Sequence, residues 1–223
     1  MQDPDGNWRR GNSRFASGSS TVYNVKAAWG LCEAGLALGR QDFVDAAVRN
    51  AEYCLTRQQP NGWYHDCCLD DPARPLLHTI AYTMQGIFEI GRLTDRDDFI
   101  AAARLTADAQ LALLRPDGFL PGRQDSNFQP ASSWACLTGI AQTSIIWRAL
   151  LHRTNDTRYR DAANLANRYL LAHHDIRNAD LRLRGGVPGS WPVTGSYGRL
   201  QILNWATKFF VDALLAEKDD RAA

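Results

Sequence analysis

Lysine is scarce in this chain. Of its 25 basic residues, three are lysine (Lys26, Lys208 and Lys218) and the others are arginine. Acidic residues number 24, which leaves a formal net charge of +1. A chain so close to neutral lacks the positive field that attracts nucleic acid or an anionic membrane surface, and neither partner is expected. The excess of arginine and alanine over lysine is typical of a GC-rich bacterial source.

Long apolar runs and strand patterns are also missing. No apolar stretch reaches the ~20 residues that a membrane-spanning helix needs. No secretory signal opens the sequence, although a shortened start would conceal one. Apolar and polar residues do not alternate with period two, so no sheet is expected beyond short pairings in the glycine-rich stretch 185–198.

The cysteines form no disulfide framework. Their count of five is odd and their spacing is irregular, which favours reduced thiols and a cytoplasmic setting. A zinc site would have to combine Cys67 and Cys68 with His65 and His78. Adjacent cysteines chelate one ion poorly, and this spacing matches no zinc motif. We therefore expect no metal and no cofactor.

The chain does contain a repeated turn. Pro60-Asn61-Gly62-Trp63 recurs as Pro116-Asp117-Gly118-Phe119, and the chain opens with Pro4-Asp5-Gly6 followed by Trp8. Proline presets φ and Asn/Asp-Gly accepts a positive φ, so each copy is predicted to be a turn. Between the second and third copies the offset is 56 residues, and an ungapped match at this offset marks a repeat protein. The matching pairs include Gly30/Gly86, Glu33/Glu89, Gly35/Gly91, Arg40/Arg96, Asp42/Asp98 and Phe43/Phe99.

Each repeat reads as two helices and a turn. The first helix is apolar nearly all round, which marks a buried helix, and the second carries charge on one face, which marks an outer layer. Short links make each pair an antiparallel hairpin. The expected first helices span residues 20–38, 77–93, 132–153 and 200–217, and the expected second helices span 41–57, 97–114 and 157–173.

Hairpins with a period near 56 residues are too long for the common solenoid repeats. They predict an all-α fold in one domain over residues 1–223, either an α/α toroid around a central funnel or an open arc, with about four inner and three outer helices. The chain opens inside a turn that should follow an outer helix. This favours the C-terminal portion of a longer toroid, completed by further hairpins or in an oligomer, over a complete small helical domain.

These features resemble two groups of α/α toroids, the six-hairpin glycosidases and the terpenoid cyclases with the prenyltransferases. The resemblance rests on the turns that lead into the inner helices, and it covers most of the chain. The aspartate motifs of terpenoid cyclases are absent, and Asp70-Asp71, in a proline-flanked loop, comes nearest to them. The zinc ligands of prenyltransferases, a phosphate-binding glycine loop, Gly-x-Ser-x-Gly and His-Glu-x-x-His are absent too.

In a toroid, the loops before the inner helices ring one mouth of the funnel. After the first of these loops, His78 and Tyr82 lie one helical turn apart on the same face. We expect them to be a catalytic acid/base pair like those of toroid lyases and epimerases; the alternative is that His78 packs at the helix start and Tyr82 fills the core. The substrate-binding candidates in the same loop are Trp63, Tyr64, His65 and Asp66.

The second loop carries Arg123, Asp125 and Trp134. Arg123 can bind a carboxylate with two parallel hydrogen bonds. Asp125 is a candidate general acid or base, or else it closes an Asx turn or a loop salt bridge. Trp134 suits stacking on a sugar or ordinary packing.

The third loop, 185–197, carries Trp191 and Tyr197 and leads to Asn204 and Lys208, which lie one helical turn apart. Lys208 either reaches a carboxylate in the funnel or extends to solvent. Flat aromatic rings with planar polar groups are typical of a carbohydrate site. We therefore expect an α/α toroid that acts on or binds a poly- or oligosaccharide, with lyase, epimerase and hydrolase chemistry left open. The alternatives are a non-catalytic scaffold for a glycan or protein and an isoprenoid-processing toroid.

Overall fold

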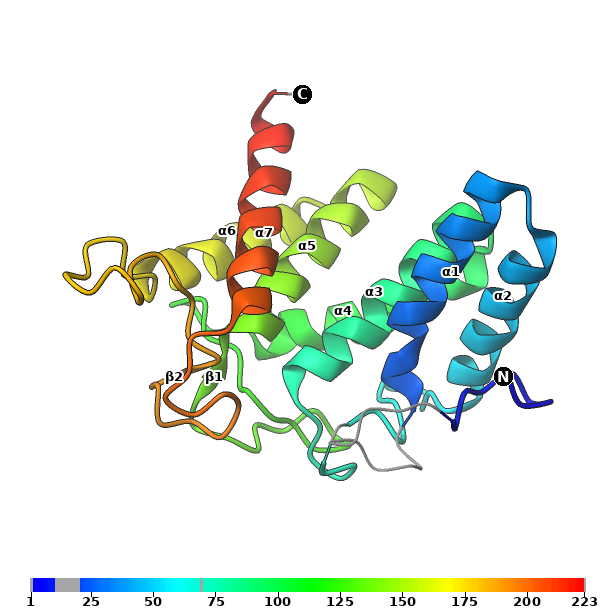
Figure 1. Cartoon of the computed structure of the whole chain (residues 1–223), viewed down its shortest axis with the longest axis horizontal. Helices are drawn as coiled ribbons and strands as arrows, with labels where there is room; N and C mark the ends of the chain where they lie inside the picture. The colour runs from blue at the N-terminus through cyan, green and yellow to red at the C-terminus, as the bar shows by residue number, and fades with distance from the viewer. Residues whose placement is uncertain (1, 11–20, 69, 223) are drawn as a thin grey trace. The chain divides into compact units, whose positions relative to one another are not determined.

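The computed structural model describes residues 2–10, 21–68 and 70–222. Over these ranges the regular secondary structure is almost entirely helical, with loops between the hairpins, which confirms the all-α expectation (Figure 1). The helices are α1 (Val25–Leu38), α2 (Gln41–Thr56), α3 (Leu77–Leu93), α4 (Asp97–Leu113), α5 (Leu137–Thr154), α6 (Thr157–Ala172) and α7 (Asn204–Ala222), and a short 3-10 helix (Val22–Asn24) precedes α1. Two short strands, β1 (Ala135–Cys136) and β2 (Ser190–Trp191), pair antiparallel.

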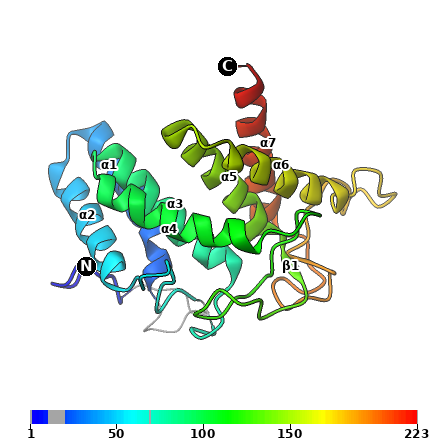
Figure 2. The same cartoon turned by 180° about the vertical axis from the view of Figure 1, so that it is seen from behind.

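The chain divides into two compact units. Unit one comprises residues 1–109 and 125–129, and unit two comprises residues 110–124 and 130–223. In unit one, α1 packs against both α2 and α3; in unit two, α5 packs against both α6 and α7 (Figure 1). Figure 2 shows α5 and α6 side by side from behind. Each unit therefore repeats one arrangement, a hairpin followed by the first helix of the next hairpin.

Burial separates α3 from α2 as the pattern of apolar residues predicts, whereas α1, also expected to be buried nearly all round, buries only the stripe Val25, Ala28, Cys32 and Gly35. Thirteen of the 17 residues of α3 are buried, on all its sides. Helix α2 buries one face, at Val44, Ala47, Asn50, Ala51 and Cys54, with spacings of three, three, one and three residues. Helix α3 is therefore an interior helix of unit one, and α2 packs its one apolar stripe mainly against α1.

A glycine sets how closely α3 approaches α1. A Cβ atom on Gly86 would lie 2.6 Å from the carbonyl oxygen of Val25, which is closer than carbon and oxygen can approach. Gly30, its counterpart one repeat earlier, has nothing within 4 Å of the corresponding position. The match between the two glycines therefore hides different roles, and only Gly86 is needed for helix packing.

The repeated turn has one geometry in all three places. The glycine N–H bonds the carbonyl oxygen three residues earlier, at distances of 3.0, 2.9 and 2.8 Å for Gly6, Gly62 and Gly118. Their φ angles are 88°, 92° and 87°, in the left-handed region that favours glycine. The three glycines are 56 residues apart, so the first copy shares the register of the other two.

Each turn also packs against the second helix of the following hairpin. Nε2 of Gln2 donates to the carbonyl oxygen of Ala46 at 2.7 Å, and Nε2 of Gln58 donates to that of Ala102 at 2.8 Å. These two hydrogen bonds are equivalent in the repeat. The third copy has Leu114 at this position, so it cannot make the bond.

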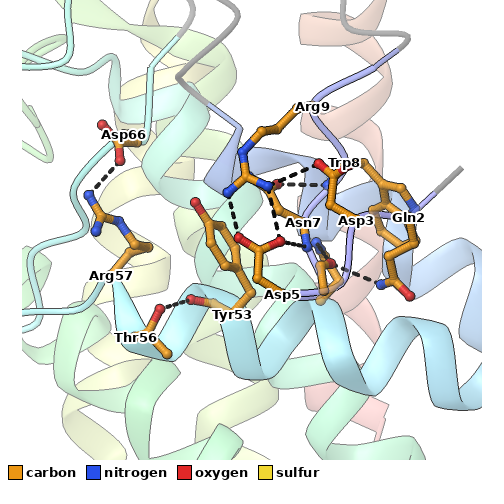
Figure 3. A network of polar contacts seen from close by, with 12 residues as sticks. Gln2, Asp3, Asp5, Asn7, Trp8, Arg9, Tyr53, Thr56, Arg57 and Asp66 are labelled. Atoms are coloured by element: carbon orange, nitrogen blue, oxygen red, sulfur yellow. Dashed lines mark hydrogen bonds and ion pairs between the residues drawn. The ribbon is translucent and has the colours of Figure 1, made fainter.

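Figure 3 shows the first turn against α2. Arg9 pairs with Asp3 at 2.9 Å and with Asp5 at 2.5 Å, and Nδ2 of Asn50 donates to the carbonyl oxygen of Gly6 at 2.9 Å. The ion pairs are exposed and contribute little stability by themselves. The hydrogen bond from buried Asn50 and the one from Gln2 to Ala46 attach the turn to the helix.

Three helix starts differ from the expectation. Helix α5 begins at Leu137 rather than Ser132 because Ala135 and Cys136 pair with β2. Helix α7 begins at Asn204 rather than Leu200 because the preceding residues pair with residues 187–189. Helix α1 begins at Val25, and the expected start at Ser20 lies outside the described residues. The pairing of β2 confirms the short strand expected within 185–198.

Candidate functional site

The clearest candidate site lies on facing sides of α1 and α3 in unit one. His78 and Tyr82 stand one turn apart on α3, with ring centroids 4.3 Å apart and ring planes tilted by 52°. His78 is buried, with 6% of its surface exposed. Burial raises the pKa of the Tyr82 phenol above its usual range, so this hydroxyl stays protonated at neutral pH.

Lys26 of α1 completes this group. Its Nζ donates to Oε1 of Gln85 on α3 at 2.6 Å. The ammonium group also lies 4.1 Å from the ring centroid of Trp29 and 5.6 Å from that of Tyr82, within the range of cation–π attraction. The close approach of the two helices at Gly86, next to Gln85, brings these side chains together.

Trp29 connects the group to a carboxylate on the same helix. Its Nε1 donates to Oε1 of Glu33 at 2.8 Å. The set Lys26, Trp29, Glu33, His78, Tyr82 and Gln85 is called the α1–α3 cluster below. It offers an imidazole and a phenol for proton transfer, an ammonium group for a carboxylate, and an indole for the face of a sugar ring.

The sequence pattern located two of the six residues of this cluster. The i, i+4 spacing pointed to His78 and Tyr82, and the structure brings their rings into contact. Lys26, Trp29 and Gln85 were missed because they lie inside segments that read as core helix. The available signal was the scarcity of lysine, since Lys26 is one of three in the chain.

The structure corrects the prediction that the aromatic residues of the first loop, Trp63 and Tyr64, bind substrate. Trp63 and Tyr64 are 3% and 2% exposed, so neither ring offers an open face to a sugar. Trp63 packs edge-on against Phe128, with centroids 5.5 Å apart. Its position follows from the turn at Gly62, whose carbonyl oxygen accepts a hydrogen bond from Thr106 of α4 at 2.7 Å.

His65 and Asp66 take structural positions in the same loop. His65 is exposed, and its Nε2 lies 2.9 Å from Nε2 of Gln59. Asp66 pairs with Arg57 at 2.6 Å, and its carbonyl oxygen accepts a bond from the N–H of Val22 at 3.3 Å. Asp66 therefore ties the loop to the residues before α1.

Asp125 closes an Asx turn, which is the alternative to a catalytic role that its loop position predicts. Its Oδ1 accepts hydrogen bonds from the N–H groups of Asn127 and Gln129, at 2.9 and 2.8 Å. These bonds close an Asx turn within the loop. The carboxylate is therefore occupied with backbone donors, and a catalytic role for Asp125 is not what this geometry favours.

In unit two, Arg123 and Trp134 lie in the segment that leads to β1. The backbone N–H of Arg123 donates to Oγ of Ser132 at 3.0 Å. The ring of Trp134 packs against two glycines: a Cβ on Gly122 would lie 2.2 Å from its Cζ3, and one on Gly195 would lie 2.9 Å from its Cγ. Trp134 therefore has a packing role between two loops.

The remaining candidates of unit two are more open. Trp191 is 38% exposed and lies 4.6 Å from the ring of His173. The hydroxyl of Tyr197 accepts a bond from Nε1 of Trp205 at 2.9 Å. Trp191 thus keeps the open face expected of a sugar platform.

Asn204 and Lys208 lie at the start of α7 and are exposed. Oδ1 of Asn204 accepts a bond from the N–H of Trp205 at 2.8 Å. Lys208 pairs with Asp212 one turn later at 2.5 Å, and its ammonium group lies 4.5 Å from the ring centroid of Phe209. Lys208 thus follows the solvent-exposed alternative.

The side chains of the adjacent cysteines, Cys67 and Cys68, contact neighbouring protein groups. Sγ of Cys67 lies 3.1 Å from Oγ1 of Thr83, and Sγ of Cys68 accepts a bond from the N–H of Asp71 at 3.0 Å. Burial raises the pKa of the Cys67 thiol to about 12. Among the residues that the structure describes, no group of three or more His, Cys, Asp or Glu side chains could hold a metal ion.

The described helices were compared with the length and apolar character that a bilayer span needs. None of those described is both long enough and apolar enough to span a bilayer.

No protein-family model and no curated protein matches the chain. Solved structures do match it. Unsaturated glucuronyl hydrolase from Bacillus sp. GL1, whose structure is described as that of an enzyme of glycosaminoglycan degradation, superposes with a TM-score of 0.67 at 16% identity, over 87% of this chain and 57% of that one. The fold is that of the α/α toroids. The chain spans less than two thirds of the length of this relative.

Two further structures agree. A family 88 glycosyl hydrolase from Bacteroides vulgatus gives a TM-score of 0.68 at 12% identity, over 95% of this chain and 65% of that one. A GH76 α-mannanase from Bacteroides thetaiotaomicron gives 0.64 at 15% identity, over 91% of this chain and 53% of that one. The likeness confirms the resemblance to the six-hairpin group, and at these identities it concerns the fold.

Proposed function

We propose that the chain is a carbohydrate-active α/α-toroid protein that acts on an acidic oligosaccharide, with the α1–α3 cluster at the reacting sugar. The observation that carries the proposal is the arrangement of Lys26 on α1 beside the His78–Tyr82 pair on α3, two helices that pack together. The relatives named above are hydrolases of saccharides, which supports the ligand class. Their Bacillus and Bacteroides sources support a bacterial origin.

The residues of the cluster suit proton transfer beside a carboxylate. Lys26 would bind the carboxylate of a uronate and so acidify the neighbouring C5–H bond. His78 would take that proton, and the electron pair would form a C4=C5 double bond as the C4–O4 bond breaks. Tyr82, kept protonated by its raised pKa, would donate its proton to the departing O4 oxygen. The rings lie 4.3 Å apart, so the proton on His78 can then return to Tyr82.

Hydrolysis fits the cluster less well. A glycosidase of the usual kind needs two carboxyl groups that flank the scissile bond. The cluster supplies Glu33, which is held by Trp29, and Glu89 further along α3 pairs with Arg92 at 2.7 Å. Proton abstraction, as in a lyase or an epimerase, therefore uses the cluster more fully. Five cysteines, all free and all buried, support the proposal of a reducing, cytoplasmic setting.

The test is turnover of a uronate oligosaccharide, followed by the ultraviolet absorbance of the new double bond and by NMR for inversion at C5. His78→Ala should reduce the rate at least about 100-fold, which matches the usual contribution of one general base, while the variant keeps its helical circular-dichroism spectrum. His65→Ala, an exposed histidine of the same unit, is the matched control and should keep the rate. A His78→Ala variant that works at the unaltered rate would remove this mechanism, and binding without turnover in the parent protein would favour the scaffold alternative.

A further inference from the structure

Unit two contains a row of four aromatic rings that the proposed reaction does not use. The rings of Phe119 and Tyr169 lie 6.1 Å apart, those of Tyr169 and His173 lie 4.2 Å apart, and those of His173 and Trp191 lie 4.6 Å apart. Tyr169 and His173 stand one turn apart near the end of α6, and Trp191 belongs to β2. The row therefore joins a helix end, a turn and a strand.

Two hollows lie on either side of the outer end of this row. Their volumes are about 470 and 510 Å³, and both are lined by Ala172, His173 and Trp191. Each volume falls within the usual range for a small-molecule site. The first hollow also has Arg115, Asp117, Ser133 and Arg168, and the second has His174, Asp175, Asn178 and Ile202.

Trp191 is held in place although its ring is open. Its strand pairs with Ala135 and Cys136 of β1. The neighbouring Ser190 donates from Oγ to the carbonyl oxygen of Tyr197 at 2.6 Å. The indole is 38% exposed, so an apolar face is presented to solvent from a fixed backbone. A rigid, open indole that lines both hollows is suited to stacking on a sugar ring, because little side-chain freedom remains to be lost on binding.

Charge distinguishes the first hollow. Arg115 pairs with Asp117 at 2.8 Å, and its guanidinium group lies 4.8 Å from the ring centroid of Phe119. Arg168 makes no hydrogen bond or ion pair with any residue that the structure describes. The hollow therefore keeps one arginine whose fork of donors can take a carboxylate.

We propose that these two hollows form a second saccharide site, which binds an acidic oligosaccharide. One sugar ring stacks on Trp191, a uronate carboxylate meets Arg168 in the first hollow, and a neighbouring sugar enters the second hollow against Asn178. This site uses no residue of the α1–α3 cluster. It is a binding site and needs no turnover.

The test is isothermal titration of the full chain with trigalacturonate and with cellotriose, an uncharged trisaccharide. Trp191→Ala should weaken the binding of trigalacturonate at least tenfold. Trp205→Ala is the matched control, because Trp205 is an exposed tryptophan of the same unit (44%) that lines neither hollow. Arg168→Gln should weaken trigalacturonate about tenfold and cellotriose hardly at all, whereas Arg160→Gln, on the same helix, should change neither.

The outcome separates this site from the proposed function. His78→Ala should leave the Trp191-dependent binding of trigalacturonate unchanged, and Trp191→Ala should leave the absorbance assay of the reaction active. No trigalacturonate binding, or equal losses for Trp191→Ala and Trp205→Ala, overturns the site. Equal effects of Arg168→Gln on both sugars overturn the assignment of the carboxylate. None of these results changes the test of His78.

Discussion

The ammonium group of Lys26 lies 2.6 Å from Oε1 of Gln85 and above the ring of Trp29, so a polar contact joins α1 to α3, the interior helix of unit one. Interior helices of a toroid bury most of their surface, and polar groups placed there need partners. Here the partners come from the neighbouring helix. The contact depends on the close approach at Gly86, which links the packing of the fold to the geometry of the candidate site.

The glycine pair of the repeat gives the first prediction. Gly86→Ala should lower the free energy of unfolding by about 1–3 kcal/mol, because the added Cβ would meet the backbone of α1. Gly30→Ala should raise it by up to about 1 kcal/mol, because the site is open and alanine favours the helix. Urea denaturation of both variants measures the difference. Similar changes for the two would contradict the packing role of Gly86.

The turn at residues 58–63 gives a second prediction about stability. Gln58→Leu copies the residue at the equivalent position of the third turn, Leu114, and removes hydrogen bonds to Ala102 and Thr106. Each such bond contributes about 1 kcal/mol, so unfolding should become easier by about 1–2 kcal/mol. Gln59→Leu, next in the chain, should stay within about 0.5 kcal/mol because its contact to His65 is exposed. A Gln58→Leu variant as stable as Gln59→Leu would argue against turn docking.

The buried charges of unit two predict a larger effect. Arg148 is 2% exposed and meets Asp220, Glu217 and Asn164. Arg148→Met would leave the mostly buried carboxylates of Asp220 and Glu217 without their arginine, so it should cost about 3–5 kcal/mol. The control is Arg40→Gln, whose exposed partner Asp42 makes the pair worth less than about 1 kcal/mol. Equal losses of unfolding free energy for Arg148→Met and Arg40→Gln in chemical denaturation would refute the difference between the buried and the exposed ion pair.

Alkaline pH should weaken the fold through Cys67. Burial raises the pKa of its thiol from 9.0 to about 12. Below pH 9 both states hold the proton; between pH 9 and 12 the unfolded chain releases it and the folded chain does not, so stability falls as pH rises. The loss amounts to a few kcal/mol, at about 1.4 kcal/mol per unit. Cys67→Ser should flatten the fall in denaturation free energy over this range, and an unchanged slope would count against it.

The local parts of the fold followed from sequence, and the long-range parts did not. The bounds of α3 agree with the expected 77–93 because its apolar residues recur on all sides of an uninterrupted helix. The start of α5 was misplaced because Ala135 and Cys136 pair with β2, far along the chain, and the start of α7 because the residues before it pair with residues 187–189; no helical periodicity records either pairing. Trp134 read as helical for the same reason, although its ring packs against Gly122 and Gly195.

For the candidate site, the spacing of residues in the sequence predicted the contacts between side chains of the same helix. His78 and Tyr82 are an i, i+4 pair, so their contact follows from helix geometry alone. Lys26 and Trp29 come from another helix, and the approach that unites them is visible only in the packing at Gly86. The loop position of Trp63 predicts a ring that is open to a sugar. The turn instead directs this ring into the protein interior.

The most direct test of the central claim is a thermal-shift measurement with uronate oligosaccharides, neutral oligosaccharides and isoprenoid diphosphates, on the parent protein and on Lys26→Met. A ligand that binds only the folded state raises the melting temperature. We predict a rise with the uronate oligosaccharides that Lys26→Met reduces, and little response to the diphosphates. A rise with the diphosphates alone, or a uronate response that Lys26→Met leaves intact, would contradict the account.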